Sequence, residues 1–400
     1  MINIPSLWYR NNIIYDPFSG QEWDISPEGF KFFQSLVKGE KTFSSLDDQE
    51  KEFVKYLKEE GLILSAKKNV TWILTLKCSL NCKHCYQNLN PLEKSISLEQ
   101  SRIILQRLLD WGIEHITFSG GDVFLSPHFF EILHTIEKSQ QNITVSILTN
   151  GYLLATNQII QKEILKFKKW KPIFQFSLYS DKENVHEEIT GIKGSFARTI
   201  KSIKFLKNNN FQVLINNVLM KSNFKDRNSL IDFITKELQI PLENINFDTL
   251  IFPFVGQKNK EVLQYSLSGD QLQQLLKEEV FEALPVKYLH YARSCTGADT
   301  RIAISPKGEL FPCNMVQDVL GNVLEESIEN ILKKGIKALS FKNYKNSVCV
   351  NCRTKFCKKC MAFTKREKFD RIYCQYVKIM DKEIQKRIKR LEDQGFQKLT

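Results

Sequence analysis

Ten cysteines in two groups constrain this 400-residue chain more than any other feature of its sequence. The first group is Cys78, Cys82 and Cys85, and the second is Cys295, Cys313, Cys349, Cys352, Cys357, Cys360 and Cys374. The N-terminus lacks the basic and apolar regions of a secretory signal, and no apolar run is long enough to cross a membrane. We therefore expect a cytoplasmic protein without membrane partners. Disulfides are rare in the cytoplasm. Ten thiols there indicate metal or redox chemistry.

The chain alternates between strand and helix patterns over residues 71 to 250. Apolar runs predict strands at 71–76, 115–118, 143–149, 173–178, 211–220 and 245–250. Helical patterns separate them near 97–111, 127–139, 156–169, 195–209 and 226–238. Such alternation is typical of a parallel sheet covered by helices. The six units predict an α/β fold, a partial (β/α)6 barrel, with functional residues at the C-terminal ends of the strands.

The remaining chain divides by composition. Residues 1–70 combine three short strand candidates (6–10, 12–16 and 21–25) with helix candidates at 26–38 and 45–60, which predicts a winged-helix-like domain. We assign 71–255 to the barrel, 256–290 to a polar bridging segment, 291–375 to a cysteine-rich domain and 376–400 to one charged helix. The cysteine-rich part has little hydrophobic periodicity, so we expect metal rather than a core to hold it together.

The first cysteine group has the spacing C-x3-C-x2-C directly after the first predicted strand. Three thiolates on one tight loop can bind three irons of a four-iron cluster and leave the fourth iron for an outside ligand. The alternative is zinc, but structural zinc sites favour four protein ligands, commonly as paired C-x2-C motifs. His84 lies between two of the cysteines and is a poor fourth ligand. The spacing favours the cluster.

The segment CSLNCKHCY resembles the radical SAM superfamily. The resemblance extends to FSGGDV (118–123), where relatives usually have Glu and Pro in place of Asp122 and Val123, to LTNG (148–151) and to FSLYS (176–180). It implies a [4Fe-4S] cluster on the three cysteines and S-adenosylmethionine (SAM) bound by Tyr86, Gly120, Gly121, Asp122, Asn150, Ser177 and Arg198. Taken singly, the glycine pairs are common turns and Arg198 a common solvated residue. The implied reaction cleaves SAM to a 5′-deoxyadenosyl radical that abstracts a substrate hydrogen.

The second cysteine group contains C-x2-C-x4-C-x2-C, which alone is typical of a zinc ribbon. Together with the C-x12-G-x4-C series from Cys295 through Gly308 to Cys313, it resembles a SPASM auxiliary-cluster domain. The resemblance implies one cluster on Cys295, Cys313 and Cys360 and another on Cys349, Cys352, Cys357 and Cys374, making three [4Fe-4S] clusters in the chain. Two cysteine-bound clusters need eight thiolates, so one position lacks a cysteine and could bind a substrate thiolate.

Two further features bear on the substrate. Asn314 stands where sulfatase-maturing relatives carry an Asp that acts as a base, and an amide cannot replace it. The segments IIYDPFSGQEWDIS (13–26) and FVKYLKEEGLI (53–63) resemble the PqqD-like recognition elements of enzymes that modify ribosomally made peptides. That resemblance implies a leader peptide added as a strand beside residues 21–25. Lys51, Lys55 and Lys58 would attract an acidic leader, although such a row is commonly a solvated helix face.

These resemblances predict a radical SAM/SPASM peptide maturase that joins a cysteine sulfur to carbon and passes an electron to an auxiliary cluster. A flavodoxin or ferredoxin would supply electrons. Carbon–carbon or carbon–oxygen crosslinking and epimerisation are alternatives. The net charge of +12 also suits a radical SAM enzyme that modifies RNA, but no basic, aromatic-interleaved module is visible. A zinc-ribbon binding protein without catalysis is the remaining alternative.

Overall fold

The computed structural model describes most of the chain. The described residues are 7–17, 21–42, 45–60, 62, 68–87, 89–93, 95–139, 141–249, 251, 260–277, 297–316, 318–338 and 371–399. Within this part, no helix is both long enough and apolar enough to cross a membrane.

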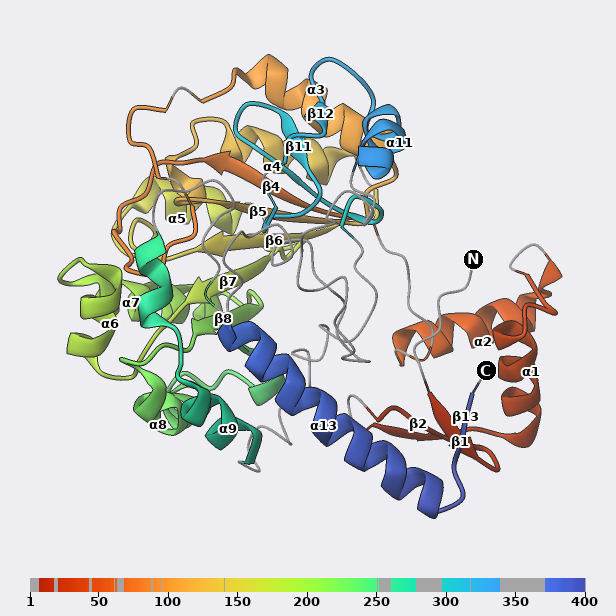
Figure 1. Ribbon diagram of the computed structural model, residues 1–400. Coiled ribbons are helices and arrows are strands. Elements are labelled where there is room, and N and C mark those ends of the chain that lie inside the picture. Colours follow the sequence, from red (N-terminus) through yellow and green to blue (C-terminus); the bar gives the residue numbers. More distant parts are fainter. Residues whose placement is uncertain are drawn as a thin grey trace.

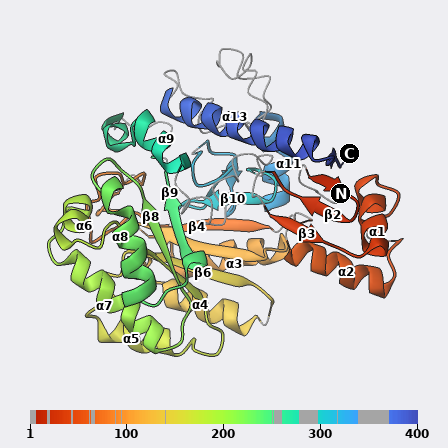
Figure 2. The same cartoon turned by 90° about the horizontal axis from the view of Figure 1, so that it is seen from below.

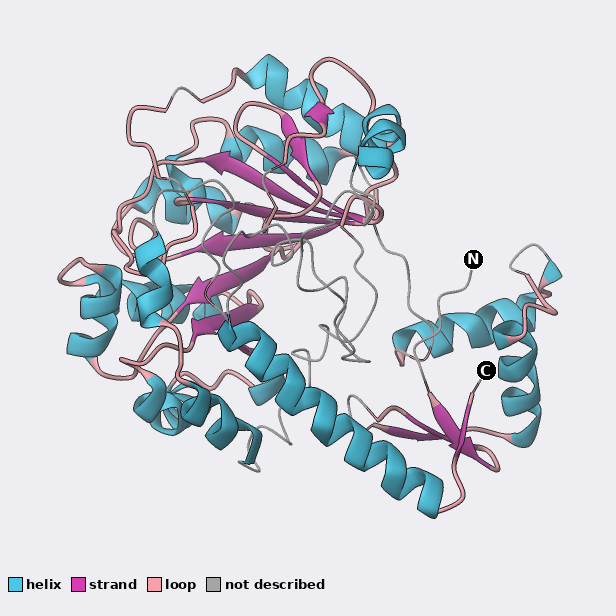
Figure 3. Ribbon diagram, in the orientation of Figure 1, coloured by secondary structure: helices cyan, strands magenta, loops and turns pink. Residues whose placement is uncertain are grey.

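The six predicted barrel strands are present and lie side by side in parallel (Figures 1 and 3). They are β4 (Asn69–Thr75), β5 (His115–Gly120), β6 (Thr144–Thr149), β7 (Ile173–Ser177), β8 (Val213–Val218) and β9 (Ile245–Asp248). They follow one another in chain order across the sheet. Because all six strands run in the same direction, their C-terminal ends lie at the same edge of the sheet, as expected of a partial barrel.

Helices cover the outer side of this sheet (Figure 1). They are α3 (Leu98–Asp110), α4 (Phe129–Lys138), α5 (Gln158–Leu165), α6 (Glu183–Thr190), α7 (Ser195–Asn208) and α8 (Arg227–Asp232), which continues into the π-helix η4 (Phe233–Glu237). The side chain of Ser97 caps α3 in a capping box with Gln100. The short, polar helix α6 was absent from the predicted set.

Each barrel strand contributes at least one fully buried side chain to the main core. One from each strand is Trp72, Phe118, Ile147, Phe176, Ile215 and Phe247. Where apolar residues occupy successive positions along a strand, both faces of the sheet are buried. This burial stabilises a parallel sheet that lies between its helices and the barrel interior.

The segment after the bridging region adds to this sheet. The strand β10 (Arg301–Ile304) pairs in parallel with β4, and β11 (Glu309–Phe311) and β12 (Gly321–Asn322) continue the sheet in antiparallel pairing before α11 (Ile328–Ala338). Ile302, Ile304, Leu310, Val323 and Ile328 are fully buried in the main core. The expectation of a region without a core is therefore wrong for residues 297–338. Strands this short carry too few residues to show periodicity.

The N-terminal unit contains the three predicted strands and two predicted helices. They are β1 (Trp8–Arg10), β2 (Ile13–Tyr15), β3 (Glu22–Asp24), α1 (Pro27–Val37) and α2 (Asp48–Glu59). The Ser26 hydroxyl accepts from the Gly29 N–H at 3.0 Å and Pro27 opens α1, which confirms the predicted helix start. Trp23, Phe33 and Leu57 are buried in a separate core.

The C-terminal segment differs from the single helix expected over 376–400. The helix α13 (Arg371–Asp393) is followed by a short strand, β13 (Gln397–Lys398), that pairs antiparallel with β1. Gly395 has a φ of +83°, which ends the helix and turns the chain. Figures 1 and 2 show α13 running from the barrel side to the N-terminal sheet, whose strand order is β13-β1-β2-β3. The α9 helix (Gly269–Lys277) lies against α13.

Candidate active site

The loop after β4 carries the cysteine triad and is held by the helix α6. The Asn81 N–H donates to the Thr190 carbonyl and the Lys83 N–H to the Ile189 carbonyl, both at 2.9 Å. An ion pair of 2.7 Å joins Lys83 to Glu188. The helix that sequence reasoning missed therefore fixes the path of the loop between Cys78 and Cys85.

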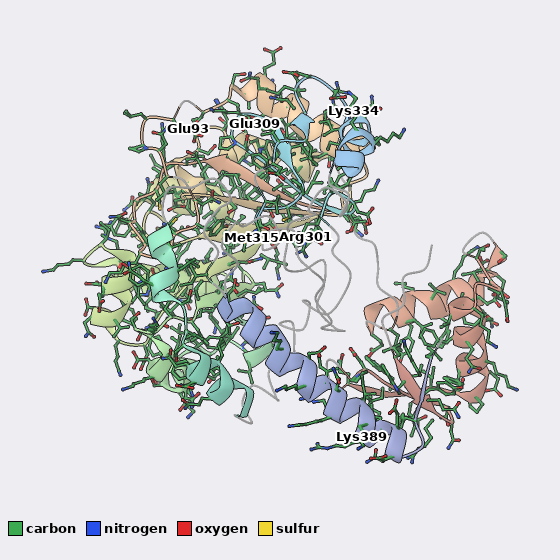
Figure 4. The ribbon with its side chains drawn as sticks, in the orientation of Figure 1. Glu93, Arg301, Glu309, Met315, Lys334 and Lys389 are labelled. Atoms are coloured by element: carbon green, nitrogen blue, oxygen red, sulfur yellow. The ribbon has the colours of Figure 1, made fainter. Side chains whose placement is uncertain are left out.

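The far end of the same loop returns to the strand. The Leu76 N–H donates to the buried carboxylate of Glu93 at 2.5 Å, and the Asn90 N–H donates to the Leu76 carbonyl at 3.0 Å. Figure 4 shows Glu93 on this loop, beyond the end of β4. The loop is thus closed onto the strand from which it starts.

The three thiols of the triad are half-buried. Burial raises the pKa of Cys78 to about 11, and it raises the pKa values of Cys82 and Cys85 as well. Within the described residues, no three Cys, His, Asp or Glu side chains converge closely enough to hold a single metal ion. A four-iron cluster does not need that convergence because each thiolate binds a different iron. Its positive irons would also offset the cost of deprotonating buried thiols.

Gly120 and Gly121 lie directly against the start of the cysteine loop. A Cβ on Gly120 would stand 2.3 Å from the Thr75 carbonyl oxygen, and a Cβ on Gly121 would stand 2.1 Å from that of Lys77. The Gly121 N–H donates to Thr75 and the Asp122 N–H to Lys77, both at 2.9 Å. The resemblance predicted that these glycines let SAM approach the backbone. In the structure, a side chain at either position would instead collide with the cysteine loop.

Asp122 is buried at the end of β5. Its Oδ1 accepts from the Thr149 hydroxyl at 3.1 Å and from the Phe124 N–H at 3.3 Å, whereas Oδ2 has no partner among the described residues. Burial raises the pKa of this carboxyl to about 6, and the two hydrogen bonds partly oppose that shift. The carboxylate is therefore positioned by one oxygen while the other remains available.

Asn150 follows β6 and reaches the triad. Its side-chain amide donates to the sulfur of Cys78 at 3.6 Å and its Oδ1 accepts from the Tyr152 N–H at 2.8 Å. The turn is held from α7, where the Thr199 and Ser202 hydroxyls donate to the carbonyls of Asn150 and Gly151 at 2.8 and 2.6 Å. The Asn-Gly pair is thus built into the site and is more than a surface turn.

Ser177 and Arg198 lie at the ends of neighbouring elements on the same edge. Ser177 is the last residue of β7, and its side chain interacts with Tyr179, whose ring packs edge-on against His84 with centroids 4.8 Å apart. The guanidinium carbon of Arg198, on α7, stands 4.1 Å from the centre of the Tyr152 ring. Arg198 is half-buried in this stack, rather than fully solvated.

Tyr86 connects the triad to the segment that carries Cys313. Burial raises the pKa of its hydroxyl, while interactions with the side chains of Ser119, Gln87 and Asn314 lower it. Asn314 directly follows Cys313 in a turn after β11. One described cysteine of the second group therefore lies near the barrel opening.

Several buried polar atoms at this opening have no hydrogen-bond partner among the described residues. They are His84 Nδ1, both amide atoms of Gln87, and Asp122 Oδ2. Unpaired buried polar atoms are rare because each costs free energy. Their concentration around three cysteines fits a polar cofactor and a substrate bound at the strand ends. Nothing in the sequence singles out Gln87, since only its surroundings reveal the missing partners.

The other predicted site residues lie elsewhere or outside the described part. Cys295, Cys349, Cys352, Cys357 and Cys360 fall outside the described residues, as does the side chain of Cys374 in α13. Lys51 and Lys55 lie on α2 in the N-terminal unit, away from the barrel opening, and the Lys58 side chain is not described (Figure 1). Lys51 forms an ion pair of 2.9 Å with Asp48.

Comparison with known proteins matches two parts of the chain. Residues 72–234 match the radical SAM superfamily, and residues 295–361 match the iron-sulfur cluster-binding domain SPASM. Together these domains imply [4Fe-4S] clusters and SAM as cofactors, in agreement with the donor set at the strand ends.

Curated relatives match about two thirds of the chain. The antilisterial bacteriocin subtilosin biosynthesis protein AlbA of Bacillus subtilis (strain 168) is 28% identical over 273 residues, which are 64% of this chain and 58% of AlbA. The sporulation killing factor maturation protein SkfB of the same strain is 25% identical over 63% of this chain and 62% of SkfB. The AdoMet-dependent heme synthase of Methanosarcina barkeri (strain Fusaro / DSM 804) is 22% identical over 66% and 81%. The chain spans less than two thirds of AlbA and SkfB.

Solved structures share the fold over most of the chain. The structure of anSMEcpe with bound AdoMet and Cp18Cys peptide has a TM-score of 0.61 and 18% identity, covering 82% of this chain and 99% of that one. Streptococcus suis SuiB bound to S-adenosylmethionine has a TM-score of 0.59 and 18% identity, covering 92% and 99%. At such identities the likeness shows the fold alone.

Proposed function

We propose that this chain, whose α/β core is a radical SAM domain and whose following segment is a SPASM domain, modifies a ribosomally made precursor peptide. The observation that carries the proposal is the convergence of the triad loop and the Cys313–Asn314 turn through Tyr86 at one barrel opening. A substrate bound there contacts both cysteine groups. The names of AlbA and SkfB, which describe biosynthesis of a bacteriocin and maturation of a killing factor, support a peptide substrate.

Different residues at the strand ends would hold the cluster and SAM. Cys78, Cys82 and Cys85 would hold one [4Fe-4S] cluster, with Asn150 donating to the first of these sulfurs. The SAM contacts would come from Tyr86, Gly120, Gly121, Asp122, Asn150, Ser177 and Arg198. When bound, the cluster and SAM supply a 5′-deoxyadenosyl radical. The protein positions the peptide and excludes water while a hydrogen atom is removed.

The proposed product is a thioether between a peptide cysteine and a carbon atom of the same peptide. The hydrogen atom from that carbon leaves in 5′-deoxyadenosine, and the thiol loses its proton as the sulfur–carbon bond forms. The one remaining electron passes to an auxiliary cluster. Cys295, Cys313 and Cys360 would hold the nearer auxiliary cluster and Cys349, Cys352, Cys357 and Cys374 the other, leaving one iron for a substrate thiolate. A flavodoxin or ferredoxin in the cytoplasm would supply the initial electron.

The N-terminal sheet offers an edge for the leader. Within the described residues, β13 covers one side of β1, whereas β3 is the last strand on the opposite edge. The Ile25 N–H donates to Asn12 and the Asp16 N–H to Gln21, so the alternating antiparallel pattern turns the main-chain groups of Glu22 and Asp24 outward. A leader strand would pair there. Because Glu22 and Asp24 are acidic, attraction for an acidic leader would come from the lysines of α2.

Mass spectrometry of a candidate peptide tests the proposal. The anaerobically reconstituted protein would be incubated with SAM, dithionite and a candidate precursor peptide, sought among any short reading frames that flank its gene. We expect the peptide to lose two hydrogen atoms and one free thiol in the same molecules. An unchanged peptide, with SAM cleaved at the same rate whether or not the peptide is present, would contradict the proposal.

A further inference from the structure

The exposed side of α13 carries a row of basic residues, which we call the basic stripe. Lys378, Lys382 and Lys389 follow one another at steps of four and seven residues, so they lie on one side of the helix. Lys386 and Arg390 continue the row at steps of four. All of these side chains are exposed, and Figure 4 shows Lys389 toward the end of α13 that meets the N-terminal sheet. At about 1.5 Å per residue, the basic stripe is about 18 Å long.

The opposite side of α13 is packed against the rest of the protein. Ile384 and Leu391, seven residues apart, are 2% and 6% exposed. Asp381 is also buried on that side, where its carboxylate accepts from the Gln385 amide at 2.7 Å. Because the apolar side of the helix is used in folding, it is not available to insert into a membrane surface. The basic stripe therefore faces soluble partners.

The charges of the basic stripe are not balanced by nearby carboxylates. Within the part of the chain that the structure describes, the side chains of Lys378, Lys382 and Lys389 form no ion pair or hydrogen bond. Exposed lysines elsewhere do form such pairs, as Lys334 does with Glu326 at 2.6 Å. Like charges four residues apart destabilise a helix. An acidic partner would remove this cost.

The basic stripe begins next to a proposed cluster ligand. Cys374 lies in the first turn of α13 and precedes Lys378 by four residues, which is about one helical turn. Under the proposed function, on which this inference rests, Cys374 binds an auxiliary [4Fe-4S] cluster through its thiolate. A protein bound to the basic stripe would thus lie beside a group that gains and loses single electrons.

Two classes of acidic macromolecule could bind a row of exposed cations. Single-stranded nucleic acid needs aromatic side chains on which its bases stack, and no aromatic residue lies between Lys378 and Arg390. Flavodoxins and ferredoxins are small acidic proteins that carry single electrons, and complementary charge steers such proteins to their docking surfaces. Both the charge of the basic stripe and its place beside Cys374 favour an electron carrier.

We propose that the basic stripe of α13 docks an acidic one-electron carrier protein of the flavodoxin or ferredoxin class. The carrier exchanges one electron with the cluster that Cys374 would hold. When a turnover starts, the reduced carrier loses this electron and the cluster gains it, and the electron then passes to the triad cluster.

Binding of a flavodoxin tests this docking surface. Its dissociation constant would be measured by isothermal titration with the oxidised, reconstituted protein at low and at high salt. The double variant Lys382→Glu/Lys389→Glu reverses two charges of the basic stripe, and Lys382→Arg/Lys389→Arg keeps them. The matched control is Lys201→Glu/Lys204→Glu, which reverses two exposed charges on α7. Each protein would also cleave SAM with reduced flavodoxin and with dithionite, a small reductant that needs no docking surface.

The glutamate variant of α13 should bind flavodoxin at least about tenfold more weakly, whereas the arginine variant and the control should stay within about twofold of the wild type. Higher salt should weaken binding by the wild type more than binding by the glutamate variant. At limiting flavodoxin, the ratio of the flavodoxin-supported to the dithionite-supported rate should fall about tenfold in the glutamate variant alone. Because both rates come from the same protein, any loss of folded or loaded enzyme cancels in this ratio.

Several outcomes would overturn the proposal. Equal binding by the wild type and the glutamate variant of α13, or an equal loss in the α7 control, excludes the basic stripe as the docking surface. Weaker binding with an unchanged ratio of rates separates the surface from electron transfer. A wild type that binds oligouridine more tightly than flavodoxin, and loses this binding in the glutamate variant, assigns the surface to nucleic acid. A wild type that docks flavodoxin as proposed but modifies no candidate peptide contradicts the proposed function and leaves the docking surface in place.

Discussion

The side-chain amide of Asn150 donates to the sulfur of Cys78 across 3.6 Å and joins the end of β6 to the first cysteine of the loop. The amide is oriented from its other side, where Oδ1 accepts from the Tyr152 N–H. Hydrogen bonds to cluster sulfurs are one means by which proteins set the reduction potential. This contact therefore connects the geometry of the barrel opening to electron transfer.

Replacement of Asn150 by Asp should lower the reduction potential of the triad cluster. Asp keeps the acceptor for Tyr152 but loses the donor to Cys78 and adds negative charge. Loss of one hydrogen bond, about 1 kcal/mol, corresponds to a shift on the order of 40 mV for one electron. Spectroscopic redox titration of the reconstituted protein measures it. Asn209→Asp, far from the triad on the end of α7, should leave the potential unchanged.

Gly121→Ala should prevent the triad cluster from assembling. The new Cβ would stand 2.1 Å from the Lys77 carbonyl oxygen and 2.9 Å from the Cβ of Cys78, so the loop has to move. Reconstituted protein should then contain roughly a third less iron, because one of the three proposed clusters is lost. Gly194→Ala is the matched control: φ there is +76° and the space around it is open, so strain of about 1 kcal/mol is its only cost. Full iron content in Gly121→Ala would show that the loop tolerates the displacement.

The stability around His186 should fall in mild acid. Its imidazole is fully buried, and burial lowers its pKa from 6.5 to about 4. Folding therefore favours the neutral ring. As the pH falls from 6.5 toward 4, the unfolded chain binds a proton that the folded protein does not, so the free energy of unfolding decreases over this range. The loss amounts to about 3 kcal/mol. Since the Tyr179 N–H donates to His186 Nδ1 at 3.3 Å, hydrogen exchange of the Tyr179 amide reports it.

His186→Asn provides the comparison for this pH dependence. Asn keeps an acceptor for the Tyr179 N–H and does not titrate. The raised pKa of Asp122, about 6, acts in the opposite direction, because stability from a protonated carboxyl is lost as the pH rises. The difference between wild type and variant is therefore the informative quantity. A difference that stays constant between pH 7 and pH 4.5 would contradict the assigned shift.

Phe396→Ala should destabilise the N-terminal unit without affecting the barrel. Phe396 is 7% exposed and packs with Trp8 and Leu391, and the Arg10 guanidinium lies 5.0 Å from its ring centre. Truncating such a residue costs about 3 kcal/mol. Limited proteolysis should then cut within residues 1–60 first, while the barrel fragment persists. Lys398→Ala, an exposed position on β13, is the control. Equal cleavage of both variants would argue against a role for the tail in this sheet.

Glu22→Pro should block leader binding at the edge of β3. Proline removes an N–H that faces away from β2, so the existing pairing of β2 and β3 is kept. Affinity for the leader should fall at least about tenfold in an isothermal titration, through loss of one or more main-chain hydrogen bonds. Glu22→Ala, which keeps the N–H, should bind as the wild type does. If both variants bind equally well, the leader does not pair with this edge.

The six barrel strands and the triad loop could be predicted from sequence because their signals are local. A continuous apolar strand such as Asn69–Thr75 has a recognisable pattern, and the cysteines follow it at fixed spacing. The pairing of Ile302 with Val70 could not be predicted, since it joins a short strand to a distant part of the chain. The pairing of Trp8 with Lys398 was missed for the same reason. Gln87 gave no signal at all, because an unmet hydrogen bond exists only in three dimensions.

Transfer of deuterium from peptide to 5′-deoxyadenosine tests the central claim most directly. The peptide would be prepared with deuterium on its carbon atoms and incubated with the reconstituted protein, SAM and dithionite. Mass spectrometry of the 5′-deoxyadenosine should show one deuterium in each molecule formed with the modified peptide. Unlabelled 5′-deoxyadenosine beside a modified peptide, or no modification of the peptide at all, would contradict radical abstraction from a peptide carbon.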